Sequence, residues 1–350
     1  MSTKGDEPLS LAAAARLEAG TEVKVYALIQ SLGRGRTANG KPYLDLVLVD
    51  ASGTLRGKVW SDAKAFEAAS PLAAGAVVVA WGRMGEFQGP QLSLSELRLA
   101  EAVSEERRVW LYGEALDEAE PYGAKTVAFD IETVPAGTLD DLPQSLRRRL
   151  DEHARRGLRR DGLGETAEAV AERVRLERST NPLLGRIVSL SLIDAESETG
   201  RVVVAAEKIV SGVLAGAGIH LVSEARLLAV YWRVARYAER LVSFNGVEFD
   251  VPFLQARSLI LGVSPGIDFG PRGSLANHVD LRDRLRLGGS GHLGSLELAC
   301  WAFGIAGPKG EHSGGDVEGL YQTGHYEELA RYNLGDARAT LALWRSLSGL

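Results

Sequence analysis

Two hydrophobic patterns divide this chain. Between residues 21 and 99, apolar and polar residues alternate in short runs separated by Gly, Asp and Ser, a pattern typical of half-buried strands joined by turns. This pattern predicts five strands and one short helix, at 22–30, 43–49, 54–60, 61–69 (the helix), 76–81 and 91–97. A polar loop is expected over residues 33–41.

From residue 125 onward, apolar strand patterns alternate with helical ones. Strands are predicted at 126–132, 186–194, 201–206 and 240–244. A polar, arginine-rich insertion, residues 138–180, separates the first two of these strands. The second region is therefore expected to be an α/β domain.

The five-strand region has the element order of an OB-fold barrel, with a helix between the third and fourth strands. Its phrases NGKPY (39–43), LVDASG (48–53) and GKVW (57–60) resemble the OB domains fused to bacterial nucleases, aminoacyl-tRNA synthetases and other nucleic-acid enzymes. We therefore expect four segments: a tail at 1–16, an OB-fold nucleic-acid-binding domain at 17–101, a linker at 102–124 and an α/β domain at 125–350.

Composition narrows the class of protein without naming a ligand. The 350 residues are 45% apolar and 25% charged, which is ordinary for a soluble globular protein. The net charge of −6 gives no global signal for nucleic acid, although a binding groove can be local. The single cysteine, Cys300, is expected to be a small buried helix residue in a reducing compartment. With no visible signal peptide and no apolar run of membrane length, we expect a cytoplasmic protein that binds no membrane.

Two carboxylate motifs lie some two hundred residues apart. Asp130 and Glu132 belong to an apolar strand, and the side-chain period of two places them on the same face. Tyr332 and Asp336 are four residues apart on a predicted helix, so they also share a face. An apolar strand has little use for two adjacent carboxylates unless a cation binds them. The pair therefore predicts a divalent-metal site.

A third motif, LVSFNGVEFDVPFL at 241–254, runs from a strand through a glycine turn into a helix. Asp250 lies near the start of that helix, at the edge of the sheet where open α/β proteins build their sites. The three motifs, in this order, resemble the DEDD superfamily of 3′→5′ exonucleases. Tyr332 stands where the tyrosine variant has its tyrosine, and Arg331 stands where the other variant has histidine.

The flanking phrases sharpen the resemblance. FDIETVP (129–135) and RYN (331–333) are similar to bacterial predicted exonucleases related to the proofreading domain of family B DNA polymerases. The resemblance implies an RNase H-like fold with a mixed sheet, and two Mg²⁺ or Mn²⁺ ions. It also implies that Asp130 bridges both ions, that Glu132 and Asp336 complete the nucleophile-side site, and that Asp250 acts on the second ion. Tyr332 would orient the attacking water.

Further residues are candidates for contacts with a single strand of nucleic acid. Aromatic rings can stack on bases and cations can bind the backbone, and the candidates are Arg34, Arg36, Lys41, Tyr43, Phe87, Arg148, Asn245 and Phe249. Asp280 is either an outer-shell carboxylate or a helix cap. Lys309 is either a site contact or a surface lysine. The arginines at 147–160 either track phosphates or form a solvated helix face, because acids are interleaved with them.

The sequence thus favours a metal-dependent 3′→5′ exonuclease that releases 5′-monophosphates. Single-stranded DNA is the first choice of substrate, RNA is the close rival, and a non-catalytic nucleic-acid-binding protein with a silent nuclease fold is the third option. The OB-fold would bind either the substrate or another protein. A replication or repair partner is conceivable, because the chain contains no polymerase region.

Overall fold

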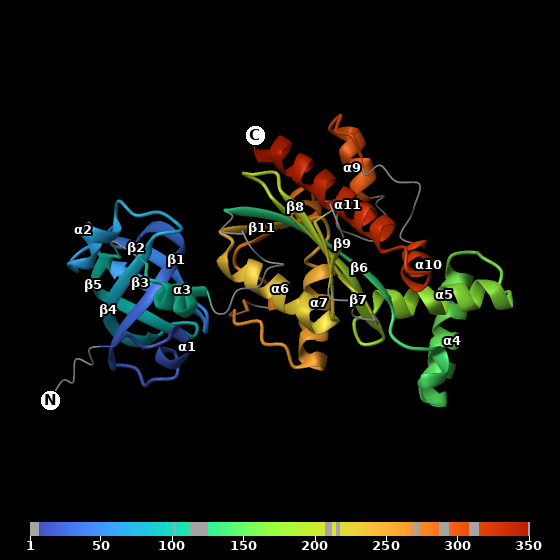
Figure 1. Cartoon of the computed structure of the whole chain (residues 1–350), viewed down its shortest axis with the longest axis horizontal. Coiled ribbons are helices and arrows are strands. Elements are labelled where there is room, and N and C mark those ends of the chain that lie inside the picture. Colours follow the sequence, from blue (N-terminus) through green and yellow to red (C-terminus); the bar gives the residue numbers. More distant parts are fainter. Residues whose placement is uncertain are drawn as a thin grey trace. The chain divides into compact units, whose positions relative to one another are not determined.

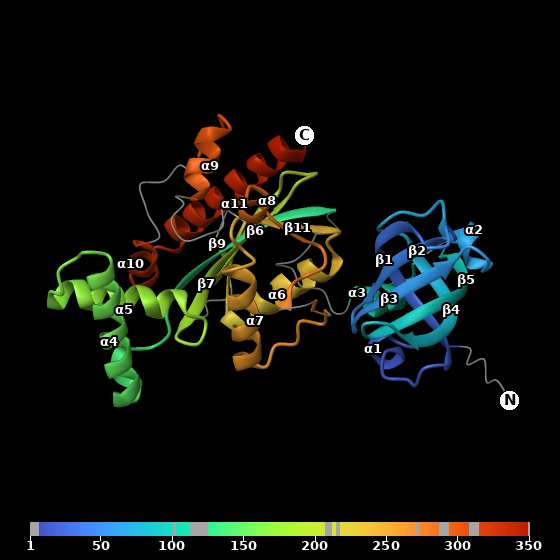
Figure 2. The ribbon, with the colours of Figure 1, turned by 180° about the vertical axis from the view of Figure 1, so that it is seen from behind.

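The computed structural model describes residues 7–100, 103–112, 125–206, 212–214, 218–267, 269–270, 273–286, 294–307 and 315–348. The chain divides into two compact units: residues 1–126 with 232–240 and 265–277, and residues 127–231 with 241–264 and 278–350. Figure 1 and Figure 2 show their elements from opposite sides. The start of the predicted tail and most of the predicted linker, residues 1–6, 101–102 and 113–124, lie outside the described ranges.

The strands of the first unit close into a barrel in the order β1-β2-β3-β5-β4. Their bounds are β1 (Glu22–Arg36), β2 (Pro42–Asp50), β3 (Gly53–Trp60), β4 (Val77–Glu86) and β5 (Pro90–Leu99). Strands β3 and β5 pair in parallel, whereas β1 pairs antiparallel with both β2 and β4. Helix α2 (Ala65–Ala69) lies between β3 and β4 in the chain. The five predicted strands are confirmed as a closed barrel.

Alternating side chains fill the barrel. In β3 the buried residues Leu55 and Val59 alternate with more exposed ones, and Leu46 and Leu48 of β2 pack with them. Met84 and Leu92 belong to the same core cluster. This alternation is the period-two signal that made the strands predictable.

The polar loop predicted at 33–41 is wrong for its first four residues. Residues 33–36 extend β1 and pair with β2, Gly33 opposite Asp45 and Arg36 opposite Pro42. Backbone pairing needs no apolar side chain, so a Gly-Arg-Gly-Arg run continues the strand even though its residues are polar and largely exposed.

Two helices flank the barrel strands in sequence. Helix α1 (Leu11–Ala14) is held by buried Asp50, whose Oδ2 accepts a 2.8 Å hydrogen bond from the Leu11 amide. Helix α3 (Glu105–Tyr112) lies inside the segment predicted to be a linker. Leu111 of α3 is buried with Tyr26, Leu28 and Val49 of the barrel strands.

The second unit contains a seven-stranded sheet in the order β12-β11-β6-β7-β8-β10-β9. The bounds are β6 (Thr126–Pro135), β7 (Gly185–Asp194), β8 (Gly200–Ala205), β9 (Gly212–Leu214), β10 (Ile219–Val222), β11 (Arg240–Ser243) and β12 (His278–Asp280). Strands β6, β7 and β8 are antiparallel neighbours, and β11 and β12 pair in parallel. The sheet is therefore mixed, as predicted.

Helices cover both faces of this sheet (Figure 1). On one face Ala128 and Ile193 pack with Ala337 and Leu341 of α11 (Tyr326–Ser348). On the other, Phe129 contacts Tyr231, with ring centroids 5.1 Å apart. The helices of that face are α6 (Glu224–Tyr237) and α7 (Asp250–Leu261). Successive residues of β6 thus face different helix layers.

The remaining helices are short, except in the arginine-rich insertion. That insertion forms η1 (Leu139–Asp141), α4 (Gln144–Arg160) and α5 (Ala167–Thr180), and the short helices are α8 (Leu281–Arg284), α9 (Leu296–Ala302) and α10 (Val317–Gln322). Cys300 is buried in α9, as predicted. Within the described ranges, no helix is both long enough and apolar enough to cross a membrane.

Candidate active site

Asp130 and Glu132 lie on the face of β6 that is turned toward α11. They alternate with the buried Phe129 and Ile131, which point the other way. Both carboxylates are partly exposed within a strand that is otherwise nearly buried. The strand therefore presents two acids on its helix-covered face, where an apolar pair would otherwise complete the core.

Helix α11 brings a third carboxylate to this pair. Ligand oxygens of Asp130, Glu132 and Asp336 all lie within 4.8 Å of one another. Asp336 is ten residues into a 23-residue helix whose apolar residues Ala337 and Leu341 pack on the sheet. Packing of this helix thus fixes the distance between motifs some two hundred residues apart in sequence.

Asn333 orients the central carboxylate. Its Nδ2 donates a 2.6 Å hydrogen bond to Asp130 Oδ2, and its Oδ1 accepts a 2.8 Å bond from Ser189 Oγ. Ser191 Oγ donates to the Asn333 carbonyl at 3.1 Å. All three of these polar residues are fully buried. Sequence reasoning quoted Asn333 only as part of a motif and did not consider the serines, although Ser189 and Ser191 interrupt an apolar strand with a period of two.

Asp250 is the first residue of α7 and is only 3% exposed. Its Oδ1 accepts a 3.2 Å hydrogen bond from the amide of Ile131, the residue between Asp130 and Glu132. The fourth carboxylate is thus attached directly to the strand that carries the first two. Its negative charge raises the pKa of both of those acids.

The four carboxylates are crowded in a poorly solvated space. Burial raises the pKa of Asp130 and Glu132 well above the ordinary range, and mutual repulsion among the carboxylates raises both further. Burial also raises the pKa of Asp250 to about 7 and that of Asp336 to about 6. A divalent cation would remove this repulsion, and its preferred ligands are oxygen atoms such as these. The residues therefore fit a divalent metal ion.

Tyr332 lies one helical turn before Asp336 and is partly buried. Burial and the nearby carboxylates raise the pKa of its hydroxyl well above 10, and that hydroxyl donates a hydrogen bond to Asp336. The phenol is thus neutral at physiological pH. Arg331, the preceding residue, points elsewhere and bonds Glu327 at 3.3 Å.

The loop that leads to Asp250 is held by Asp280. Its two carboxylate oxygens accept hydrogen bonds from the amides of Asn245 (2.8 Å) and Val247 (2.9 Å), and one of them also caps α8 through the Arg282 amide at 2.9 Å. Asn245 adopts a positive φ of 70°, and its side chain accepts a hydrogen bond from Arg282. Phe249 precedes α7 and contacts Phe253. Asp280 therefore acts as a cap and as a loop anchor at once.

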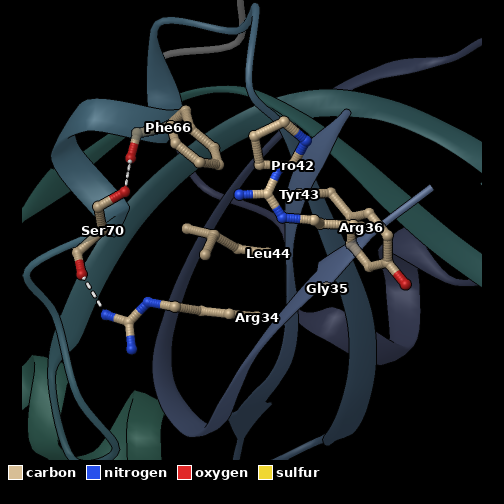
Figure 3. A pocket seen from close by; sticks show the side chains of 8 residues that line it. All are labelled: Arg34, Gly35, Arg36, Pro42, Tyr43, Leu44, Phe66 and Ser70. Atoms are coloured by element: carbon tan, nitrogen blue, oxygen red, sulfur yellow. Dashed lines mark hydrogen bonds between the residues drawn. The ribbon is translucent and has the colours of Figure 1, made fainter. Parts of the chain in front are cut away.

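Three of the candidate nucleic-acid contacts in the barrel line one hollow of about 300 Å³ (Figure 3). Arg34 donates to the Ser70 carbonyl at 2.8 Å, and Arg36 donates to the Gly40 carbonyl at 3.0 Å. The third, Tyr43, rests against Gly35, where an added Cβ would lie 2.4 Å from the ring. Both arginines are exposed, so the hollow presents cations beside an aromatic ring.

The other predicted contacts are spread over the molecule. Lys41 bonds Asp62 at 2.7 Å, and Phe87 is 61% exposed in the turn between β4 and β5. Tyr43 is only partly exposed, because Trp60 lies 5.7 Å away edge-on and Lys58 lies over its ring at 4.1 Å. Arg148 is 78% exposed on α4. Lys309 lies outside the described residues.

A mixed sheet with a partly buried acidic cluster defines the class of site, and comparison with known proteins narrows it. Residues 181–348 match the family described as "Predicted 3'-5' exonuclease related to the exonuclease domain of PolB". This match includes Asp250, Tyr332 and Asp336, but it begins after the strand that carries Asp130 and Glu132. Geometry alone attaches that strand to the matched region.

Two relatives are each named 3'-5' exoribonuclease YhaM. The protein from Oceanobacillus iheyensis is 33% identical over 107 residues, which is 30% of this chain and 33% of that protein. The Bacillus subtilis protein is 38% identical over 93 residues, which is 26% and 28% of the two chains. The chain therefore spans about a third or less of the length of these curated relatives.

Solved structures give only short resemblances. The asparaginyl-tRNA synthetase of Pyrococcus horikoshii is 19% identical, with a TM-score of 0.24 over 28% of this chain and 24% of that one. PriB of Ralstonia solanacearum is 13% identical, with a TM-score of 0.21 over 23% of this chain and 97% of that one. Scores this low do not define the fold.

Proposed function

We propose that this protein is a divalent-metal-dependent 3′→5′ exonuclease. The observation that carries the proposal is the cluster of Asp130, Glu132 and Asp336, whose ligand oxygens lie within 4.8 Å of one another. The match of residues 181–348 to a predicted exonuclease family supports it independently, because that match does not include β6. The three motifs resemble those of the DEDD superfamily, and by this resemblance we assign the site to the tyrosine variant.

Asp130, Glu132 and Asp336 would hold the metal, with Asp250 beside them. Bound divalent cations supply charge stabilisation for phosphodiester hydrolysis, where negative charge develops on the attacking and leaving oxygens. Asn333 holds Asp130 in one orientation through its 2.6 Å hydrogen bond, and the Ile131 amide does the same for Asp250 at 3.2 Å. The chain thus fixes its ligands before substrate arrives, as efficient metal sites require.

Tyr332 is suited to orient the attacking water and not to deprotonate it. Its pKa is raised by burial and by neighbouring carboxylates, so its hydroxyl keeps its proton at neutral pH. A neutral phenol both donates and accepts hydrogen bonds. Tyr332→Phe is therefore expected to slow hydrolysis without changing cation affinity greatly.

We further propose that the barrel is an OB-fold that binds a single strand, and that the second unit is an RNase H-like domain. The barrel order β1-β2-β3-β5-β4, with parallel β3 and β5, supports the first assignment. The interior position of the carboxylate-bearing β6 in a mixed sheet, between β11 and β7, supports the second. The boundaries that we propose are 17–101 for the barrel domain, 102–124 for the linker and 125–350 for the nuclease.

DNA and RNA are both candidate substrates. The family description relates residues 181–348 to a polymerase exonuclease domain, which favours DNA. The curated relatives are named exoribonucleases, which favours RNA, although they share at most 107 aligned residues with this chain. One comparison thus favours DNA as the substrate, and another favours RNA.

One experiment tests activity, direction and sugar together. Single-stranded DNA, duplex DNA and RNA of one sequence, each labelled at the 5′ end, are incubated with Mn²⁺, with Mg²⁺ or with chelator. The proposal expects a ladder of labelled products that shorten from the 3′ end, and only when metal is present. Immediate release of the labelled 5′ nucleotide would reverse the direction, and the absence of any cleavage would contradict the proposal.

A further inference from the structure

The arginine-rich insertion, which follows the strand that carries Asp130 and Glu132, forms a helical arm; we call residues 138–180 the α4–α5 arm. Helix α4 carries seven arginines against two acids, in a chain whose net charge is −6. Leu150, Ala154 and Leu158 of α4 pack against Ala169, Val170 and Val174 of α5. The arm therefore has a small core of its own and concentrates positive charge on one element.

The arm is fixed to the strand that carries the acids. Thr133, the residue after Glu132, donates a 2.8 Å hydrogen bond to the Ser179 carbonyl at the end of α5. Buried Arg178 donates to the carbonyls of Ala136 and Gly137 at 3.1 and 2.8 Å. One turn before Ser179 in α5, Arg175 bonds Glu318 of α10 at 3.0 Å. These bonds attach α5 to β6, to the turn that follows β6 and to α10.

Several arginines of the arm are already used within it. Arg147 bonds Asp140 and Arg155 bonds Asp151, both at 2.8 Å. Arg159 bonds Glu165 in the loop between the two helices, also at 2.8 Å. Among the described residues, Arg148 has one distant partner, Glu152, at 3.9 Å. The interleaved acids thus neutralise one side of α4 and do not neutralise the whole helix.

A second side of α4 keeps its charge. At about 100° per residue, Arg149, Arg156 and Arg160 fall within about 40° of one another, opposite the packed residues Ala154 and Leu158. All three arginines are exposed. In the part of the chain that the structure describes, Arg149 and Arg156 make no ion pair. Arg160 contacts Asp161 at 3.4 Å, but Arg173 shares that carboxylate at 3.3 Å.

We propose that Arg149, Arg156 and Arg160 form a binding face for the phosphate backbone of a single nucleic-acid strand whose 3′ end reaches the carboxylate cluster. The inference rests on the proposed exonuclease function and assigns the path of its substrate. So far as the structure describes the chain, the carboxylate cluster presents no cationic side chain to a polyanion, whereas an exposed face of arginines attracts one. Guanidinium groups suit this role because they bind phosphate oxygens through two parallel hydrogen bonds.

The three arginines are spread along the axis of α4. At 1.5 Å per residue, Arg149 and Arg156 are about 10 Å apart along the helix, and Arg156 and Arg160 are about 6 Å apart. A hollow of about 580 Å³, lined by Gln144, Ser145, Arg147 and Arg148, lies at the start of the same helix. Of its lining residues, Ser145 lies one turn before Arg149 on the same side, whereas Gln144, Arg147 and Arg148 are turned about 100–160° away from that side.

The expected effect follows from counterion release. Each phosphate contact on a single strand contributes about 0.7 to the slope of log K against log salt. Loss of three contacts should lower that slope by about 2. If the wild type and the variant bind equally at 1 M salt, the variant should then bind about 100-fold more weakly than the wild type at 0.1 M salt. A solvated helix face with no ligand would change neither quantity beyond the effect of net charge.

The test measures binding of a fluorescent 20-nucleotide DNA and its RNA counterpart over a series of salt concentrations, with chelator present so that no cleavage occurs. The triple variant Arg149→Gln/Arg156→Gln/Arg160→Gln is compared with the wild type. A control with the same charge change elsewhere carries Arg16→Gln, Arg338→Gln and Arg345→Gln, three exposed arginines outside the arm and the barrel strands. A third variant replaces the same face with lysines, which keeps the charge and the helix.

The inference expects the glutamine variant to bind about 100-fold more weakly at 0.1 M salt, with a slope lower by about 2. The remote control and the lysine variant should stay within a few-fold of wild type. Equal weakening by the remote control would overturn it, as would wild-type binding by the arm variant. Binding to phosphatidylserine vesicles but not to either oligonucleotide would assign the face to membranes instead.

Cleavage of a dinucleotide separates this inference from the proposed function. A dinucleotide is too short to span the arm, so the glutamine variant should cleave it at the wild-type rate while losing activity on the 20-nucleotide strand. If neither the wild type nor any variant cleaves the dinucleotide or the 20-nucleotide strand, the exonuclease proposal fails while the binding result still stands. If the wild type cleaves and the arm variant binds the long strand normally, only the arm inference fails.

Discussion

Asp250→Asn is expected to stabilise the metal-free protein while abolishing its activity. Asp250 is 3% exposed, and burial raises its pKa from 3.8 to about 7. Asparagine keeps an oxygen for the 3.2 Å bond from the Ile131 amide but removes the charge. The variant therefore loses a destabilising buried carboxylate without creating a cavity.

The magnitude and its pH dependence follow from linkage. Because the folded pKa is raised, the wild type loses stability as pH rises from about 4 to about 7, and the full penalty applies above pH 7. At 1.36 kcal/mol per pKa unit, the difference between 3.8 and about 7 corresponds to about 4 kcal/mol. The charge of Asp250 also contributes to the raised pKa of Asp130 and Glu132, so the three groups titrate together. We therefore expect a gain of roughly 2–4 kcal/mol at pH 8 and almost none at pH 4.

The assay is urea denaturation of both proteins at pH 4, 6 and 8 in chelator, compared through the difference in the free energy of unfolding at each pH. Asp45→Asn serves as a control, because that side chain is 54% exposed and should change stability by less than about 0.5 kcal/mol. Added Mn²⁺ should stabilise the wild type more than the variant. A difference that is equal at pH 4 and pH 8, or a destabilised variant, would refute the description of the site as a crowded set of carboxylates.

Three further changes test separate parts of the molecule. Glu224→Ala removes a buried carboxylate that accepts two 2.8 Å bonds from Arg257, so urea denaturation should show a loss of about 3–5 kcal/mol, and Glu224→Met/Arg257→Met should lose less. Asn333→Ala frees Asp130, so kcat at saturating Mn²⁺ should fall about 10–100-fold with little change in KM; an unchanged kcat would remove Asn333 from the site. Gly35→Ala places a Cβ 2.4 Å from the Tyr43 ring and should weaken oligonucleotide binding several-fold. The control Gly33→Ala, whose Cβ would lie 3.9 Å from its nearest atom, should leave binding unchanged. Equal effects of the two variants would show that Tyr43 does not contribute to binding.

Much of the fold was accessible from local patterns. The barrel strands and β6, β7 and β8 form where apolar periodicity predicted them, because burial of one or both faces enforces that period. Local periodicity also placed Asp130 with Glu132 and Tyr332 with Asp336. The extension of β1 through Arg36 was missed, because a pairing made only by backbone groups leaves no apolar signal.

Other features depend on contacts between distant residues. The short strands β9, β10 and β12 have at most four residues each and exist through their neighbours in the sheet. The role of Asn333 needs Ser189 and Asp130, which lie 144 and 203 residues away in sequence. The arginines of α4 looked equivalent in sequence, and only the ion pairs of Arg147, Arg155 and Arg159 separate them from Arg149 and Arg156.

The most direct test of the carboxylate centre compares wild type, Asp336→Asn and Asp45→Asn on 5′-labelled single strands with increasing Mn²⁺. Asp336 belongs to the 4.8 Å cluster, whereas Asp45 is an exposed barrel residue. The wild type and Asp45→Asn should shorten the strand from its 3′ end in a metal-dependent manner. Asp336→Asn should leave the strand intact, and its midpoint of urea denaturation should be no lower than that of the wild type. Cleavage by Asp336→Asn at the wild-type rate would contradict the assignment of this cluster as the catalytic centre.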